Sequence, residues 1–202
     1  KFLLFQLTIN VAACLIVLLG SLLGTESPLT ITQMLWVNLI MDTFAAGALA
    51  SLPPNERVMK DKPRRSGKDG DFIITRPMAY NIFGVGFAFV VILMGLLFYF
   101  HAQDGLTPHD LSWFFSFFVM LQFWNMFNAK AFMEGRSAFA NLKDSKSFLL
   151  VALLILIGQY LIVTFGGEMF SVIPLSLRDW AIIIGSSSLV LWIGELFRLS
   201  KR

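Results

Sequence analysis

The stretch Gln33-Met34-Leu35-Trp36-Val37-Asn38-Leu39-Ile40-Met41-Asp42-Thr43-Phe44 decides the fold, because it places a carboxylate and an amide inside a long apolar segment. That segment runs from Leu29 to Leu52, and a helix needs about 20 residues to cross the hydrocarbon core of a membrane. A charged side chain at the middle of such a helix costs about 2.5–3.5 kcal/mol on insertion scales, so Asp42 marks a candidate functional position. The stretch therefore predicts a transmembrane helix that carries an ion site.

The composition of the whole chain is typical of an integral membrane protein. Its 202 residues are 56% hydrophobic and 14% charged, and the mean hydropathy is +0.72. A soluble domain carries about 25% charged residues to cover its surface. The single cysteine, Cys14, excludes a disulfide framework within the chain. We therefore expect an all-α fold that sits in a membrane.

Six apolar segments are long enough to cross a membrane as helices. A short turn joins the first two segments into an antiparallel hairpin, and a polar loop at 53–76 separates the second from the third. No internal repeat is visible. The prediction is one transmembrane domain over residues 1–202, a six-helix bundle with spans at about 2–23, 29–52, 77–100, 111–133, 147–165 and 179–197.

The basic residues predict how this bundle is oriented. All sixteen Lys and Arg residues except Arg178 fall near the chain ends, in the loop 53–76 or around the loop between the fourth and fifth spans. In a bundle of six spans these regions share one side of the membrane, and the positive-inside rule puts that side, with both termini, in the cytoplasm. Membrane insertion and attraction to anionic lipid explain the net charge of +3 without a nucleic-acid partner.

Polar side chains within the spans form a candidate cation site. Asn38 lies four residues before Asp42, so both point to one face of a helix. Asn10 lies at a similar depth in the first span. Carboxylate and amide oxygens are ligands that Ca²⁺ prefers, but one carboxylate is few for a divalent cation, so a second is expected from elsewhere. The alternative is a polar seam, in which the amides hydrogen-bond between helices and Asp42 is protonated.

Other polar or small residues in the spans have simpler explanations. Glu195 lies three residues before Arg198 near the end of its span, so an ion pair accounts for it. Small residues at 45–48 and at 50 follow Asp42, which permits close helix packing or local unwinding. A further polar stripe recurs at three-residue intervals in the fourth span: Gln122, Asn125 and Asn128.

The stretch quoted first, with Ala48-Leu49-Ala50 and Pro53-Pro54 after it, resembles the sixth transmembrane helix of P-type calcium-transporting ATPases of the plasma-membrane type. The opening Lys1–Val11 is similar to the fifth helix of that family, and Phe118–Gln122 with Asn125 and Asn128-Ala129 is similar to the eighth. The resemblance covers essentially the whole chain as helices five to ten. It implies the membrane half of an ATP-driven Ca²⁺ export pump, in a plasma membrane or a bacterial cytoplasmic membrane.

The resemblance also implies roles for individual residues. Asn38 and Asp42 match the helix-six ligands of the one calcium site that plasma-membrane pumps retain, and Asn10 is a weaker candidate ligand. The second calcium site of the sarcoplasmic-reticulum type is expected to be lost, because its positions hold other residues: Ala13, Met41 and Gln122. The loop 53–76 is expected to contact the phosphorylation domain through its basic residues: Arg57, Lys60, Arg64 and Arg65.

The remainder of the pump is implied as the partner of this chain. Helices one to four, including the second carboxylate, and the phosphorylation, nucleotide and actuator domains belong to the N-terminal half, with membrane lipid around the bundle. ATP and Mg²⁺ would bind only those domains, so no catalytic residue is expected here and this chain alone should not hydrolyse ATP. Two alternatives remain open: an autonomous six-helix secondary cation transporter or channel, which the lack of internal repeats disfavours, and a non-transporting membrane scaffold.

Overall fold

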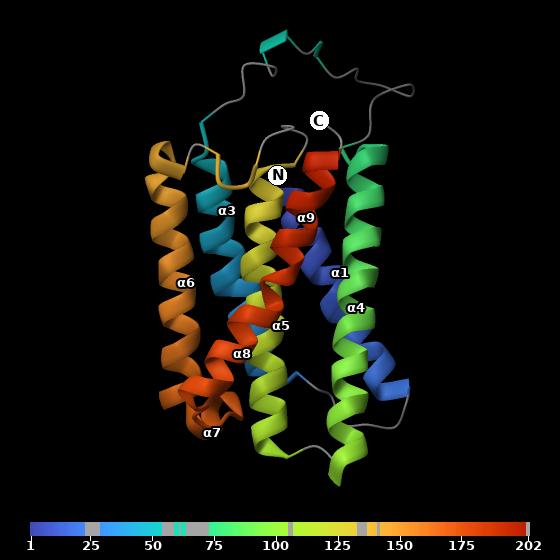
Figure 1. Ribbon diagram of the computed structural model, residues 1–202, viewed down its shortest axis with the longest axis vertical. Coiled ribbons are helices and arrows are strands. Elements are labelled where there is room, and N and C mark those ends of the chain that lie inside the picture. Colours follow the sequence, from blue (N-terminus) through green and yellow to red (C-terminus); the bar gives the residue numbers. More distant parts are fainter. Residues whose placement is uncertain are drawn as a thin grey trace.

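The computed structural model describes residues 1–22, 29–53, 59–60, 62–63, 73–104, 107–132, 137–140 and 142–200, which contain helices and no strand. The predicted all-α class is confirmed for this part of the chain. The helices run side by side along one axis (Figure 1). In chain order they are α1 (Phe2–Leu22), α2 (Ile31–Leu35), the π-helix η1 (Trp36–Met41), α3 (Asp42–Ala50), α4 (Arg76–Asp104), α5 (Pro108–Lys130), the 3-10 helix η3 (Leu142–Asp144), α6 (Lys146–Phe165), α7 (Gly167–Phe170), α8 (Leu177–Ser187) and α9 (Leu189–Ser200).

Four helical segments in the described part are long and apolar enough to cross a membrane: Phe2–Leu22, Arg76–Gln103, Lys146–Phe165 and Leu177–Ser200. They correspond to the predicted first, third, fifth and sixth spans. The last of them is divided at Ser188 into α8 and α9. The predicted second span is divided into α2, η1 and α3, so no single helix covers it.

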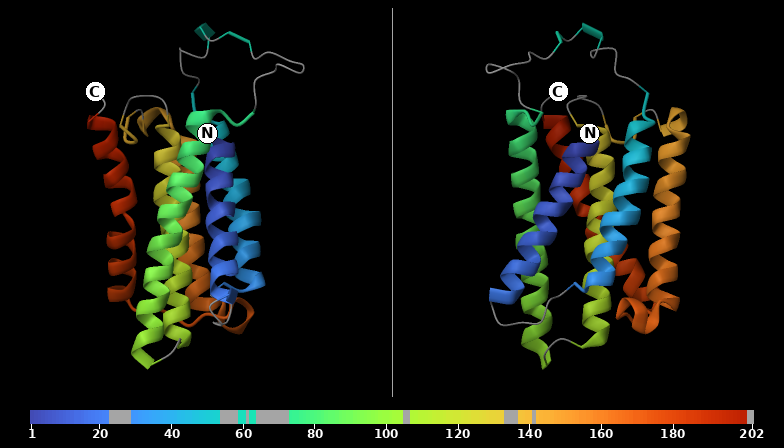
Figure 2. Two further views of the ribbon diagram at one scale, coloured as in Figure 1. Left: turned by 90° about the vertical axis from the view of Figure 1, so that its right-hand side faces the viewer. Right: turned by 180° about the vertical axis from the view of Figure 1, so that it is seen from behind.

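The predicted fourth span, α5, is long enough at 23 residues but less apolar than the other long helices. Its position in the bundle explains this difference. α1, α4, α6, α8 and α9 all pack against α5, which lies between them in both views of Figure 2. Most of its side chains are buried, including the polar Ser112, Ser116 and Gln122. Because neighbouring helices shield α5 from lipid, it can carry polar residues that a lipid-facing helix excludes.

The outer helices show the opposite pattern. Large apolar side chains are exposed along α4 and α6, as expected for surfaces whose solvent is hydrocarbon rather than water. On α4 these include Phe83, Phe87 and Val91, and on α6 they include Leu150, Leu153 and Ile157.

One end of the bundle contains the start of α1, the end of α5 and the end of α9 (Figure 1). Lys1 Nζ donates to the carbonyl of Lys130 at 2.6 Å. The buried Lys130 side chain in turn donates to the carbonyls of Ala138 at 3.4 Å and Ala140 at 2.6 Å. These bonds fasten the segment between α5 and α6 onto the end of the bundle.

Glu195 joins the same end of the bundle from α9. Its carboxylate accepts a hydrogen bond from Arg198 and a second from the backbone N–H of Ala138 at 2.7 Å. The ion pair predicted for Glu195 is therefore confirmed. The second bond also ties α9 to the segment that follows α5.

α5 and α9 cross closely at Gly194. A Cβ added at Gly194 would lie 2.9 Å from Asn128 Cγ. The Asn128 amide donates to the carbonyl of Val190 at 3.1 Å and accepts from Arg198 at 3.1 Å. Asn128 therefore hydrogen-bonds between helices, as the polar-seam interpretation predicted for this residue.

We expect the variant Gly194→Ala to lower the free energy of unfolding by about 1–3 kcal/mol, because the new methyl group displaces the Asn128 amide and overpacks the crossing. Thermal or denaturant unfolding of the purified protein in detergent measures this change. The matched control is Gly185→Ala on α8, where a Cβ meets no atom within 4 Å and the change should be neutral or stabilising. Equal effects at the two positions would contradict the close crossing.

Candidate cation site

The helix that carries Asn38 and Asp42 changes its geometry between them. α2 begins with a capping box, in which Thr30 Oγ1 accepts from the N–H of Gln33 at 3.3 Å and Gln33 Oε1 accepts from the N–H of Thr30 at 3.2 Å. The backbone then forms the π-helix Trp36–Met41 and returns to an α-helix at Asp42. π-helical turns are rare and occur frequently at functional sites. The irregular turn thus coincides with the predicted site.

The small residues that follow Asp42 lie in the regular α-helix α3. Small residues permit either close helix packing or local unwinding, and here they serve close packing. Ala45 and Ala48 are fully buried, and α3 packs against α1 and α6. The irregular geometry lies before Asp42, not after it.

The structure brings together the elements that carry the three predicted ligands. Asn38 is exposed on η1, Asp42 is the first residue of α3, and the half-buried Asn10 lies near the middle of α1. α1 and α3 are in contact, and the left view of Figure 2 shows them next to each other. The side chains of Asp42 and Met41 lie outside the described part of the chain.

The other positions of the expected lost site are inside the bundle. Ala13 on α1 and Gln122 on α5 are both fully buried. Neither Nε2 nor Oε1 of Gln122 has a hydrogen-bond partner among the described residues, which is uncommon for a buried amide. Ala13 offers no side-chain ligand, and Gln122 offers a neutral one.

The described residues contain no group of three or more His, Cys, Asp or Glu side chains that could hold a metal ion. Of the predicted loop contacts, Lys60 is exposed, whereas Arg57, Arg64 and Arg65 lie outside the described residues.

Sequence reasoning missed a polar cluster beside η1. Trp36 Nε1 donates to Gln159 Oε1 on α6 at 2.9 Å, and Gln159 Nε2 donates to Ser116 Oγ on α5 at 3.4 Å. A glutamine in the middle of the apolar fifth span was a signal that could have identified the cluster, because an amide within a membrane needs a partner.

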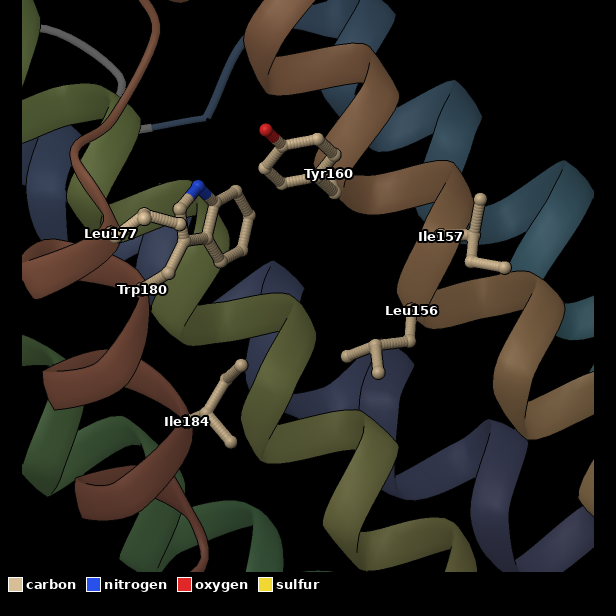
Figure 3. Close-up of a pocket in the computed structure, with 6 residues that line it drawn as sticks. All are labelled: Leu156, Ile157, Tyr160, Leu177, Trp180 and Ile184. Atoms are coloured by element: carbon tan, nitrogen blue, oxygen red, sulfur yellow. The ribbon is translucent and has the colours of Figure 1, made fainter.

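An apolar groove between α6 and α8 does not provide a second cation site. Figure 3 shows side chains from the two helices facing each other across it. The hydroxyl of Tyr160 is the one oxygen-bearing side-chain group in its lining, and the indole N–H of Trp180 is buried. The groove is lined by Leu156, Ile157, Tyr160, Leu177, Trp180 and Ile184.

Comparison with known proteins identifies the family of the chain. Residues 26–200 match the family described as "Cation transporting ATPase, C-terminus". Plasma membrane calcium-transporting ATPase 1 of Homo sapiens is 37% identical over 209 residues, which cover 97% of this chain and 17% of that protein. Plasma membrane calcium-transporting ATPase 2 of Oreochromis mossambicus is 37% identical over 203 residues, which cover 94% of this chain and 18% of that protein.

These alignments follow nearly the whole chain, which spans about a sixth of the length of the curated relatives. The family match and the helical bundle agree with the resemblance found in the sequence. The chain therefore belongs to the cation-transporting ATPase family and corresponds to its C-terminal region.

Proposed function

We propose that this chain is the C-terminal membrane part of an ATP-driven pump that exports Ca²⁺ across the plasma membrane. The observation that carries this proposal is the alignment with plasma membrane calcium-transporting ATPases along 97% of the chain at 37% identity. The alignment takes in the stretch from Gln33 to Phe44, with its π-helix and intramembrane carboxylate. An autonomous transporter is not favoured, because the relatives carry this region within much longer proteins.

In this proposal Asn38 and Asp42 are ligands of the transported Ca²⁺, with Asn10 as a weaker third. The π-helix that contains Asn38 and ends just before Asp42 supports this assignment, because interruption of regular helical bonding makes backbone carbonyls available beside the side-chain oxygens. Ca²⁺ takes six to eight oxygen ligands, more than these residues supply. The exposed face at Asn38 leaves space for further ligands, including a second carboxylate from the N-terminal part of the pump.

A single Ca²⁺ is moved per cycle. This inference is supported by the residues at the second set of positions, where Ala13 contributes no side-chain oxygen and Gln122 contributes a neutral amide instead of a carboxylate. Met41 at the third position has only a thioether, which hard cations avoid. One site with Asp42 as its charge therefore remains in this part of the pump.

Release of Ca²⁺ leaves Asp42 without its counter-charge inside the membrane, where an isolated carboxylate is costly. We therefore infer that Asp42 takes up a proton when the cation leaves. Ca²⁺ affinity that is independent of pH would contradict this proton step.

The energy for the transport cycle comes from ATP, which the N-terminal domains bind together with Mg²⁺. The loop 53–76 contacts the phosphorylation domain through four basic residues: Arg57, Lys60, Arg64 and Arg65.

The proposed topology is one domain of six spans, with both termini and the loop 53–76 in the cytoplasm and lipid against the outer helices. The distribution of Lys and Arg supports the orientation. The position of the start of α1 and the end of α9 at one end of the bundle supports an even number of crossings (Figure 1).

Cysteine labelling in intact cells tests this topology. In a Cys14→Ser background, we expect Arg178→Cys to react with a membrane-impermeant maleimide added outside, because this exposed residue lies in the first turn of the last span, at its proposed outer end. The exposed Lys60→Cys should react only after the membrane is permeabilised. Labelling of both cysteines from outside, or of neither, would show that the proposed orientation or span number is wrong.

Substitution of the proposed charged ligand tests the function. In the full-length pump, Asp42→Asn should lower the apparent affinity for Ca²⁺ by at least about 100-fold, because loss of a buried charge partner costs about 3–5 kcal/mol. ATP-driven uptake of ⁴⁵Ca²⁺ into membrane vesicles measures this affinity. The matched control is Asp144→Asn, an exposed carboxylate on η3, which should leave it unchanged. Unchanged transport in Asp42→Asn would favour the scaffold interpretation.

A further inference from the structure

The first residue of η1 is held in a fitted site on α6. Trp36 is 7% exposed, and a Cβ added at Gly158 would lie 2.9 Å from the tip of its indole ring. The glycine therefore provides the space that the ring occupies. The adjacent Gln159 accepts the indole N–H at 2.9 Å. Packing and a directional bond thus both fix the position of this side chain.

The bond to Trp36 continues to a third helix. Gln159 is fully buried, and its amide N–H donates to the hydroxyl of the fully buried Ser116 on α5 at 3.4 Å. Hydrocarbon cannot replace a lost hydrogen-bond partner. Each polar group in this series of hydrogen bonds therefore relies on the next residue of the series for its partner. The start of the π-helix is thereby connected to the central helix of the bundle.

A second bond lies one helical turn before Trp36 on the same helix. Gln33 is three residues earlier, so it shares a face with Trp36, and its side chain donates to the carbonyl of Phe170 on α7 at 2.8 Å. Two successive turns of this helix are therefore bonded to α6 and α7. Figure 1 shows α6 and α7 joined at the end of the bundle where α7 lies.

The opposite side of the same helix carries the proposed ligand. Asn38 follows Trp36 by two residues, about half a helical turn, and it is exposed whereas Trp36 is buried. One side of the segment is thus bound to the protein, and the other side presents Asn38.

A π-turn accommodates about one more residue per turn than an α-helix, so a return to α-geometry would rotate the two ends of the segment relative to each other by about 100°. α3 is packed against α1 and α6 at the far end of η1. If the near end is also fixed, the π-turn cannot relax in this way. Asn38 and Asp42, which lie on and just after the turn, then keep one relative orientation.

We propose that Trp36 and Gln159 form an anchor that holds η1 in its π-helical geometry and so positions Asn38 and Asp42 for the cation. Both are positioning residues, since neither supplies a ligand. The inference rests on the proposed function, because it assigns a role at the same site.

The anchor predicts a specific change in the full-length pump. Trp36→Phe keeps a ring beside Gly158 but removes the indole N–H, which leaves a buried amide oxygen without that donor. We expect the apparent affinity for Ca²⁺ to fall about ten-fold, with the maximal Ca²⁺-dependent ATPase rate changed less than two-fold (about 0.4 kcal/mol or less). Gln159→Leu should have a similar effect, and the double variant should not be additive, because the two residues share one bond.

Two controls separate this role from general damage. Trp192→Phe makes the same change at an exposed tryptophan on α9 and should leave the affinity unchanged. Thermal unfolding in detergent reports on folding in every variant. Unchanged Ca²⁺ affinity in Trp36→Phe and Gln159→Leu, or additive effects in the double variant, would overturn the anchor. A fall in the maximal rate and unfolding temperature without a change in affinity would also overturn it.

Asp42→Asn in the same assay distinguishes the failure of the anchor from the failure of the proposed function. If Asp42→Asn abolishes high-affinity transport while Trp36→Phe leaves affinity intact, the function stands and the anchor is wrong. If Asp42→Asn has no effect, the proposed cation site is wrong, and the anchor has no ligand to position.

Discussion

Hydrocarbon offers no hydrogen-bond partner to an amide, a hydroxyl or an indole N–H, so every such group inside a membrane must find its partner within the protein. Many polar side chains of the bundle meet this constraint on or beside α5, although the Gln122 amide has no partner among the described residues. Ser116 connects this helix to α6 through Gln159, and Trp124 donates to Ser187 on α8 at 3.1 Å. Asn128 connects it to α9. Several of the polar bonds between helices therefore meet at one shielded helix.

Hydropathy was sufficient for the all-α class and for four of the predicted spans, because membrane thickness and helical rise fix the length of a span. It was not sufficient for the geometry within a span. The π-turn at Trp36–Met41 could not be read from its residues, because the turn begins where Trp36 packs against Gly158, far away in the sequence. The break at Ser188 between α8 and α9 was likewise hidden in one continuous apolar segment.

The candidate site, like the fold, could be predicted only in part from the sequence. The depth and spacing of Asn38 and Asp42 indicated oxygen ligands, while the identity of the cation as Ca²⁺ came from the resemblance. The ion pair of Glu195 was expected from its neighbour Arg198, and it is present. Hydrogen bonding of Asn128 between helices was expected from the general behaviour of amides in membranes, and Asn128 donates to the carbonyl of Val190. The isolation of the Gln122 amide among the described residues could not be foreseen, because it depends on how five helices surround α5. Local patterns thus identified candidate ligands, whereas the hydrogen bonds of Trp36 and Gln159 beside them became visible only in the tertiary structure.

The polar character of α5 has a consequence for how the chain is made. Nascent segments leave the ribosome one after another, and the translocon releases each into lipid according to its own hydrophobicity. α5 lacks the hydrophobicity of the other long helices, and its shielding neighbours α6, α8 and α9 are synthesised after it. α1 and α4 precede it and pack against it. We therefore expect α5 to enter the membrane together with α4, the helix that directly precedes it and packs against it.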